Sequence, residues 1–154
     1  MLSPNIKKIL DNHEFVIVAT SDGKGTPNAA PMFLVKTEDR LIYLVDYTMG
    51  TTYRNLKANP QVSVSISDHE TLIGFKFNGH VKLLQEGPVY KKIVEAFKEK
   101  TLTLSIERIL SGIRRKKSHG GFEVQLPEKF VVYEIHIEEV VEIEPGGLIK
   151  KLSE

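Results

Sequence analysis

The 154-residue sequence contains no cysteine and no tryptophan. The absence of cysteine excludes disulfides, thiolate metal sites and a cysteine nucleophile, and it removes one argument for secretion. Its apolar runs are strand-sized and fall short of the roughly 18 consecutive apolar residues that a membrane span needs. The formal net charge of +1 provides no general attraction to nucleic acid. We therefore expect neither a membrane nor a nucleic-acid partner.

The chain has the composition of a globular protein, with 41% hydrophobic and 27% charged residues. Its length fits one domain, so we expect residues 1–154 to form a single domain. The N-terminal segment mixes lysines with acids and lacks a long apolar core, which argues against a signal peptide and for a cytoplasmic location. The five histidines show no zinc-like spacing, so no metal site is expected.

The first half of the chain has the pattern of an antiparallel sheet. β-Branched and alternating runs predict strands at 15–20, 30–36, 41–45, 61–67 and 71–84, after a short helix that begins at Ser3-Pro4. Pro27 and Pro31 predict an edge position or a bulge in the second run, because proline cannot donate to the ladder. A short helix follows the polar turn at 48–52 and ends at Asn59-Pro60.

The second half adds a helical segment and further strands. Pro88 opens a predicted helical excursion over residues 88–117, whose apolar residues recur at helical spacing. Strands are predicted at 122–126 and 130–145, and residues 146–154 read as a loosely held end. Five or six short strands with one helical excursion predict a mainly β protein, a small barrel with helices.

The order of these segments resembles the FMN-binding split barrel, the group related to pyridoxamine 5′-phosphate oxidase. The resemblance rests on DGKGTPNAAP, MFLVK, LIYLVDYTMGTTYRNLKANP, VSVSI and GFKFNGHVKLL, with FVVYEIHIEEVVEI as the closing strand. It implies an antiparallel Greek-key split barrel. It also implies a homodimer that binds two FMN molecules at the subunit interface.

The resemblance further implies where FMN lies. The ring is expected against residues 31–36 and 41–47, and the phosphate near the turn Gly50-Thr51-Thr52. Short hydroxyl side chains and free N–H groups at a helix start suit a phosphate. Lys36 aligns with a lysine that the oxidases use near FMN. The expected cofactor contacts are Met32, Phe33, Leu34, Lys36, Asp46, Tyr47, Thr51, Thr52 and Asn55.

Several positions depart from the oxidase pattern. Thr51 and Thr52 stand where the oxidases carry an Arg-Lys pair, and Pro31 stands where an arginine is typical. Gly74 falls about where a flavin-contacting glutamine would be. Lys36, Arg54 or a basic residue of the partner subunit would have to compensate. Pyridoxamine phosphate oxidase activity itself is not expected, because the C-terminal substrate signature with its tryptophan has no counterpart here.

Alternatives remain open at this point. Thr51 could only cap the short helix, Asn55 could be a helix-surface residue, and Tyr53 could be either a rim aromatic or a flavin contact. The predicted function is a flavin-dependent oxidoreductase of unknown substrate, with no catalytic residue assigned. The alternatives are a flavin carrier or electron-transfer protein without turnover, and a split barrel that binds haem or a deazaflavin.

Overall fold

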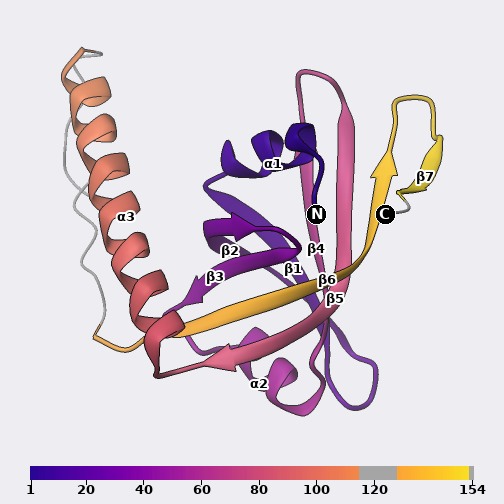
Figure 1. Ribbon diagram of the computed structural model, residues 1–154, viewed down its shortest axis with the longest axis horizontal. Helices are drawn as coiled ribbons and strands as arrows, with labels where there is room; N and C mark the ends of the chain where they lie inside the picture. Colours follow the sequence, from indigo (N-terminus) through magenta and orange to yellow (C-terminus); the bar gives the residue numbers. More distant parts are fainter. Residues whose placement is uncertain (115–127, 153–154) are drawn as a thin grey trace.

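The computed structural model describes residues 1–114 and 128–152 and folds them around one antiparallel sheet (Figure 1). The strands run in the order β3-β2-β1-β4-β5-β6-β7, and an additional β3–β6 pairing closes the first six into a barrel. The elements are α1 (Pro4–Asp11), β1 (Phe15–Ser21), β2 (Pro27–Glu38), β3 (Leu41–Asp46), α2 (Thr51–Ala58), β4 (Gln61–Asp68), β5 (Ile73–Leu84), α3 (Pro88–Arg114), β6 (Val131–Ile143) and β7 (Ile149–Leu152).

The connectivity at one side of the barrel is a Greek key. Strands β1, β2 and β3 are joined by turns, and α2 then carries the chain back so that β4 pairs with the far side of β1. The spatial order β3-β2-β1-β4 is that of a Greek key. The predicted mainly β split barrel is therefore confirmed.

Side-chain alternation along the strands produces two apolar clusters. In β1, Val16 and Val18 point into the barrel while Phe15 and Ile17 point outward. The barrel interior is filled by residues such as Leu44, Phe77 and Tyr133. A second cluster, between the outer face of β2, β3 and β6 and helix α3, contains Phe33, Val35, Tyr43, Val45, Ile93, Val94, Phe97, Phe130 and Val132.

A glycine allows β5 and β6 to approach closely. The register between the two strands shifts between Asn78 and Gly79. A Cβ atom on Gly79 would lie 1.9 Å from the carbonyl oxygen of His136. Only glycine fits where another backbone comes this near.

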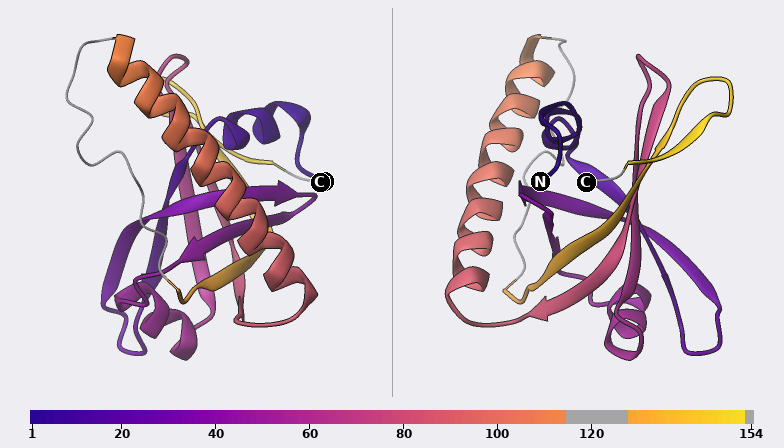
Figure 2. Two further views of the ribbon diagram at one scale, coloured as in Figure 1. Left: turned by 90° about the vertical axis from the view of Figure 1, so that its left-hand side faces the viewer. Right: turned by 45° about the vertical axis from the view of Figure 1, so that its right-hand side comes forward.

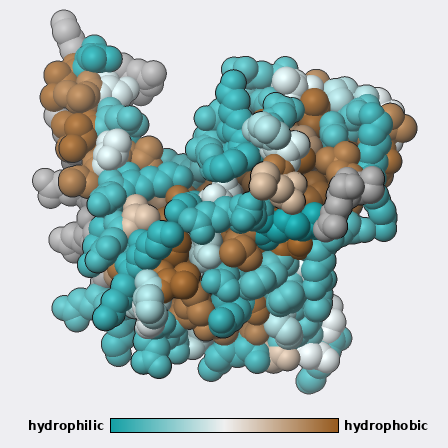
Figure 3. Space-filling model, viewed as in Figure 1, coloured by the Kyte–Doolittle hydropathy of each residue, from teal (hydrophilic) through white to brown (hydrophobic). Residues whose placement is uncertain are grey.

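Helix α3 is one continuous helix of 27 residues, as the apolar spacing predicted; positions 115–117 of the predicted excursion lie outside the described residues. Its N-terminal half packs on the barrel through Ile93 and Phe97. Its second half still reaches the barrel at Arg108, which pairs with Glu14, before the C-terminal end of the helix projects beyond the barrel (Figures 1 and 2). Apolar side chains are exposed along that second half (Figure 3), including Leu102, Ile106 and Leu110. None of the helices in the described part of the chain is long and apolar enough to cross a membrane.

The chain ends differ in how well they were predicted. Helix α1 begins as expected, with the Ser3 hydroxyl accepting a hydrogen bond from the Ile6 N–H at 3.3 Å. The prediction of a loosely held C-terminal end is wrong, because β7 pairs with β6 after a turn in which Gly146 and Gly147 both have positive φ. Lys151 also pairs with Glu139 at 2.6 Å. The strand predicted at 122–126 lies outside the described residues.

Candidate functional site

The first half of β2 has one side open. Residues 27–33 pair with β1, whereas pairing with β3 begins only at Phe33. The prolines thus sit where β2 has a single partner, as predicted, and Pro31 lies opposite Ile17. The irregularity in the ladder falls between Leu34 and Lys36 and not at the prolines. An open strand edge near Pro31 leaves backbone groups available to a ligand.

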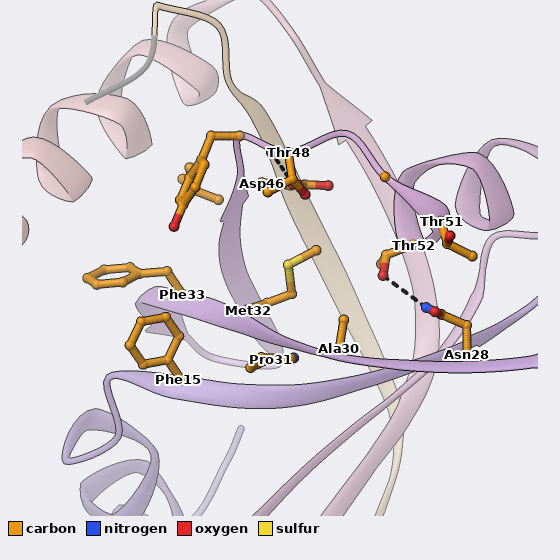
Figure 4. A pocket seen from close by; sticks show the side chains of 13 residues that line it. Phe15, Asn28, Ala30, Pro31, Met32, Phe33, Asp46, Thr48, Thr51 and Thr52 are labelled. Atoms are coloured by element: carbon orange, nitrogen blue, oxygen red, sulfur yellow. Dashed lines mark hydrogen bonds between the residues drawn. The ribbon is translucent and has the colours of Figure 1, made fainter. Parts of the chain in front are cut away.

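A hollow of about 250 Å³ lies beside this edge, between β2, the end of β3 and the start of α2 (Figure 4). Asn28, Thr51 and Thr52 lie at one end, and Phe15 and Phe33 lie at the other (Figure 4). The complete lining is Phe15, Asn28, Ala30, Pro31, Met32, Phe33, Val45, Asp46, Tyr47, Thr48, Gly50, Thr51 and Thr52. The hollow is smaller than the roughly 300–1,000 Å³ of ordinary ligand pockets.

A larger groove of about 670 Å³ lies between α1 and the turn that joins β4 to β5. Its lining includes several titratable side chains, among them Glu14, Asp68 and His69. It also includes His13, whose ring nitrogens already face the carbonyl oxygens of Ile9 and Ser67 at 2.8 and 3.2 Å. Its lining contains neither the open part of β2 nor the start of α2. We therefore place the candidate site in the smaller hollow.

The polar end of the hollow is the start of α2. Gly50 is the N-cap residue and no side chain caps the helix, so the proposal that Thr51 acts as the cap is wrong. The exposed Thr51 hydroxyl instead accepts a hydrogen bond from Arg54 Nη2 at 2.9 Å. Uncapped N–H groups, the helix dipole and a guanidinium thus meet at one point, which is an arrangement that binds anions.

A buried hydrogen-bond network holds α2 against the sheet. Asn28 Nδ2 donates to Thr52 Oγ1 at 3.0 Å and to Thr20 Oγ1 at 3.2 Å. Asn55 Nδ2 donates to the same Thr20 oxygen at 3.1 Å. Asn55 is only 6% exposed, so its assignment as a helix-surface residue is wrong. Its contacts position α2, and with it Thr52, beside the strand edge.

Asp46 shapes the turn between β3 and α2. Its Oδ1 accepts hydrogen bonds from the Thr48 N–H and hydroxyl, both at 2.8 Å, and from the Met49 N–H at 3.1 Å. Its Oδ2 accepts from the Tyr133 hydroxyl at 2.5 Å. Burial, and then the Asp46 carboxylate, raise the pKa of Tyr133, which therefore remains a donor. Asp46 thus positions the backbone that leads to Gly50.

Six of the nine predicted contacts line the hollow: Met32, Phe33, Asp46, Tyr47, Thr51 and Thr52. The other three do not. Leu34 is 1% exposed and faces the barrel interior, Asn55 is buried in the network, and Lys36 is ion-paired with Glu38. Tyr53 is also absent from the lining; its hydroxyl accepts a hydrogen bond from Gln85, which fits a rim aromatic.

Sequence reasoning missed Asn28 and Phe15 as lining residues. A polar amide in an otherwise small and apolar run was a signal for Asn28. Nothing in the local pattern marked Phe15, which reaches the hollow because β1 pairs with β2 in the register Phe15↔Phe33. Among the residues that the structure describes, no three histidine or acidic side chains gather in a way that could hold a metal ion.

The closed Greek-key sheet and the hollow at the open edge of β2 define a split barrel. The sequence matches the pyridoxamine 5′-phosphate oxidase family over residues 2–144, and the chain belongs to that family.

Individual relatives differ in what they are described as binding. A 70-residue stretch is 31% identical to the haem oxygenase HutZ of Vibrio cholerae; the match spans 46% of this chain and only 39% of that protein. HupZ of Group A Streptococcus superposes with a TM-score of 0.65 at 24% identity, covering 96% of this chain and 98% of that one. An FMN-binding, pyridoxamine 5′-phosphate oxidase-related protein of Nostoc punctiforme has a TM-score of 0.63 at 13% identity, covering both chains completely. The two structural similarities establish the fold alone.

Proposed function

We propose that this protein binds FMN in the hollow beside β2, as a homodimer, and acts as a flavin-dependent oxidoreductase. The observation that carries the proposal is the division of one hollow into an anion-binding end at the start of α2 and an apolar, aromatic end at Phe15 and Phe33. FMN has the same division, with a phosphate at one end and a flat ring at the other.

The phosphate would lie at Gly50-Thr51-Thr52. The missing Arg-Lys pair is compensated in this proposal by Arg54, which reaches back one turn to Thr51. Lys36 is unsuited to that role because its ammonium is paired with Glu38 and lies outside the lining of the hollow. Where the oxidases offer the phosphate two cationic side chains, this chain would offer one cation and the uncapped N–H groups at the start of α2.

The ring would lie along Met32, Phe33 and Tyr47, against the unpaired side of β2. Backbone N–H and C=O groups on that side can hydrogen-bond the polar edge of a flavin. The bound flavin would supply the redox chemistry, while the protein provides the slot and the anchor. No side chain is assigned as a catalytic acid or base.

A second copy of the chain would complete the site. Phe15, Ile17 and Tyr47 are 46%, 45% and 46% exposed, and they lie on or next to the walls of the hollow. Exposed aromatic and aliphatic side chains gathered beside an incomplete site are typical of an interface. A partner subunit packed there would cover these side chains and enlarge the 250 Å³ hollow into a flavin-sized pocket.

Haem is the second candidate, because HutZ is described as a haem oxygenase. Haem iron in proteins is held by a histidine, cysteine, methionine or tyrosine. The residues described around the hollow include neither histidine nor cysteine, and only Met32 and Tyr47 belong to those four types. This chemistry favours FMN over haem. A deazaflavin would fit the same anchor and remains a prediction.

The cofactor test is a spectrum. Protein as purified should show flavin absorbance, release flavin on denaturation and elute as a dimer. Apo-protein should bind FMN when it is titrated with FMN, and a separate titration with haemin tests the haem alternative. A Soret band would favour haem, and failure to bind either would refute the cofactor proposal. Anaerobic reduction of the FMN complex by NADH or NADPH then separates an oxidoreductase from a carrier, since a carrier shows no turnover.

A further inference from the structure

A second, smaller cavity adjoins the candidate cofactor site. It has a volume of about 130 Å³ and lies between the barrel and α3. It shares Phe15, Phe33 and Tyr47 with the larger hollow, and α3 supplies its far wall. Its complete lining is Glu14, Phe15, Phe33, Tyr47, Phe97, Thr101, Leu104 and Arg108.

The walls of this cavity are aromatic and held in place. Phe33 makes edge-to-face contacts with Phe15 and Phe97, at centroid distances of 5.5 and 5.0 Å. The Lys100 ammonium lies 5.6 Å above the Phe33 ring and donates to the Leu34 carbonyl at 2.7 Å. Edge-to-face contacts of this kind fix ring orientation, so the cavity does not depend on a mobile wall.

One polar group in the cavity wall has no hydrogen-bond partner. Thr101 is 6% exposed, and within the described part of the chain its hydroxyl is the one buried side-chain oxygen or nitrogen left without a partner. Its neighbours on α3 differ: Thr103 donates to the Glu99 carbonyl at 3.1 Å, and Ser105 donates to the Thr101 carbonyl at 2.8 Å. A buried hydroxyl without a partner is destabilising and calls for an explanation.

We propose that this cavity is a binding compartment for a single aromatic ring that carries one hydroxyl group, and that Thr101 hydrogen-bonds that hydroxyl. The size supports one ring, because an apolar cavity of roughly 150 Å³ is known to hold benzene. The aromatic walls suit a planar ligand, and the Arg108–Glu14 ion pair forms part of the cavity lining. The identification of this ring as part of the substrate rests on the proposed flavin function, since the ring would lie beside FMN. Binding of the ring itself does not depend on the flavin function.

The test compares phenol with toluene, which carries a methyl group in place of the hydroxyl. Binding of each ligand to flavin-free protein is measured by calorimetry or ligand-observed NMR. Wild-type protein should bind phenol, and Thr101→Val should weaken phenol binding by roughly fivefold, the value of one hydrogen bond. Toluene binding should stay unchanged or tighten in the same variant. An unchanged preference for phenol over toluene, or no phenol binding at millimolar concentrations, would overturn the proposal.

A filling variant provides a second, independent measurement. Leu104→Phe should abolish binding of both ligands, whereas Leu102→Phe, the same change at a side chain that is 64% exposed on the same helix, should not. Retained phenol binding in Leu104→Phe, with a wild-type circular dichroism spectrum, would place the ligand elsewhere and refute the compartment. FMN titration of the wild-type protein separates the two proposals. If wild-type protein binds phenol but not FMN, the cofactor proposal fails and the ring-binding proposal stands.

Discussion

The phosphate anchor provides the sharpest test of the proposed cofactor. The change is Arg54→Gln, which removes the guanidinium that donates to Thr51 and leaves a shorter, neutral side chain that can still form hydrogen bonds. Arg54 is exposed and belongs to neither apolar cluster, so the variant should fold normally. Thr52→Ala is a poorer choice, because Thr52 is buried and accepts a hydrogen bond from Asn28.

The expected magnitude follows from Coulomb's law. A unit charge pair about 4 Å apart contributes about 1 kcal/mol in bulk water, and a phosphate monoester carries about −1.5 to −2 at neutral pH. With solvent screening we expect FMN affinity to fall by roughly tenfold. Riboflavin, which lacks the phosphate, should bind both proteins equally.

The assay is quenching of flavin fluorescence on titration with protein. In about 1 M salt, where the Debye length falls to about 3 Å, the difference between wild type and Arg54→Gln should shrink. Lys57→Gln is the matched control, because it removes one cation from the last turn of the same helix. An equal loss for FMN and riboflavin, or an equal loss in Lys57→Gln, would contradict the assignment of the anchor.

Three further predictions concern the fold that supports the site. Gly79→Ala should unfold the protein or lower its melting temperature severely, because the new Cβ would lie 1.9 Å from a backbone oxygen. Gly74→Ala is the control and should be tolerated, because the nearest atoms to its new Cβ lie at 3.7 Å. Equal melting temperatures for the two variants would refute the argument. Thr20→Val should cost about 1–3 kcal/mol in urea unfolding and weaken FMN binding, since the buried Asn55 amide loses its acceptor and Asn28 keeps only Thr52. A change below about 0.5 kcal/mol would contradict this. Burial, and then the charge of Glu134, raise the pKa of Tyr43 to about 12, so the neutral phenol is favoured in the folded state. Wild-type stability should therefore fall as pH rises from about 10 through about 12, and Tyr43→Phe should show a shallower fall in the same unfolding series.

Much of the barrel was predictable because it depends on local pattern. The alternation in β1 and β4, the Ser3-Pro4 helix start and the stop at Asn59-Pro60 all appear in the structure as expected. The C-terminal strand was missed, since β7 is short and is stabilised by pairing with β6. A four-residue strand has too little sequence pattern of its own to be recognised without its partner.

The candidate site divides in the same way. Thr51 and Thr52 could be predicted, because hydroxyls at the start of a short helix follow from adjacent residues. Asn55 could not be placed, because its role depends on Thr20, which lies 35 residues earlier in the chain. Lys36 pairs with Glu38 two residues along the same strand, where alternation puts both side chains on one face, so this pairing was within reach of the sequence pattern.

The sequence by itself determined a mainly β chain with a polar turn before a short helix, since these features depend on neighbours along the backbone. Only the tertiary structure decided which side of each strand meets another element. It placed Phe15 of β1 and Thr101 of α3 at cavities beside the same Phe33. The physical reason is that strand register and helix docking are set by long-range packing, which residue spacing does not encode.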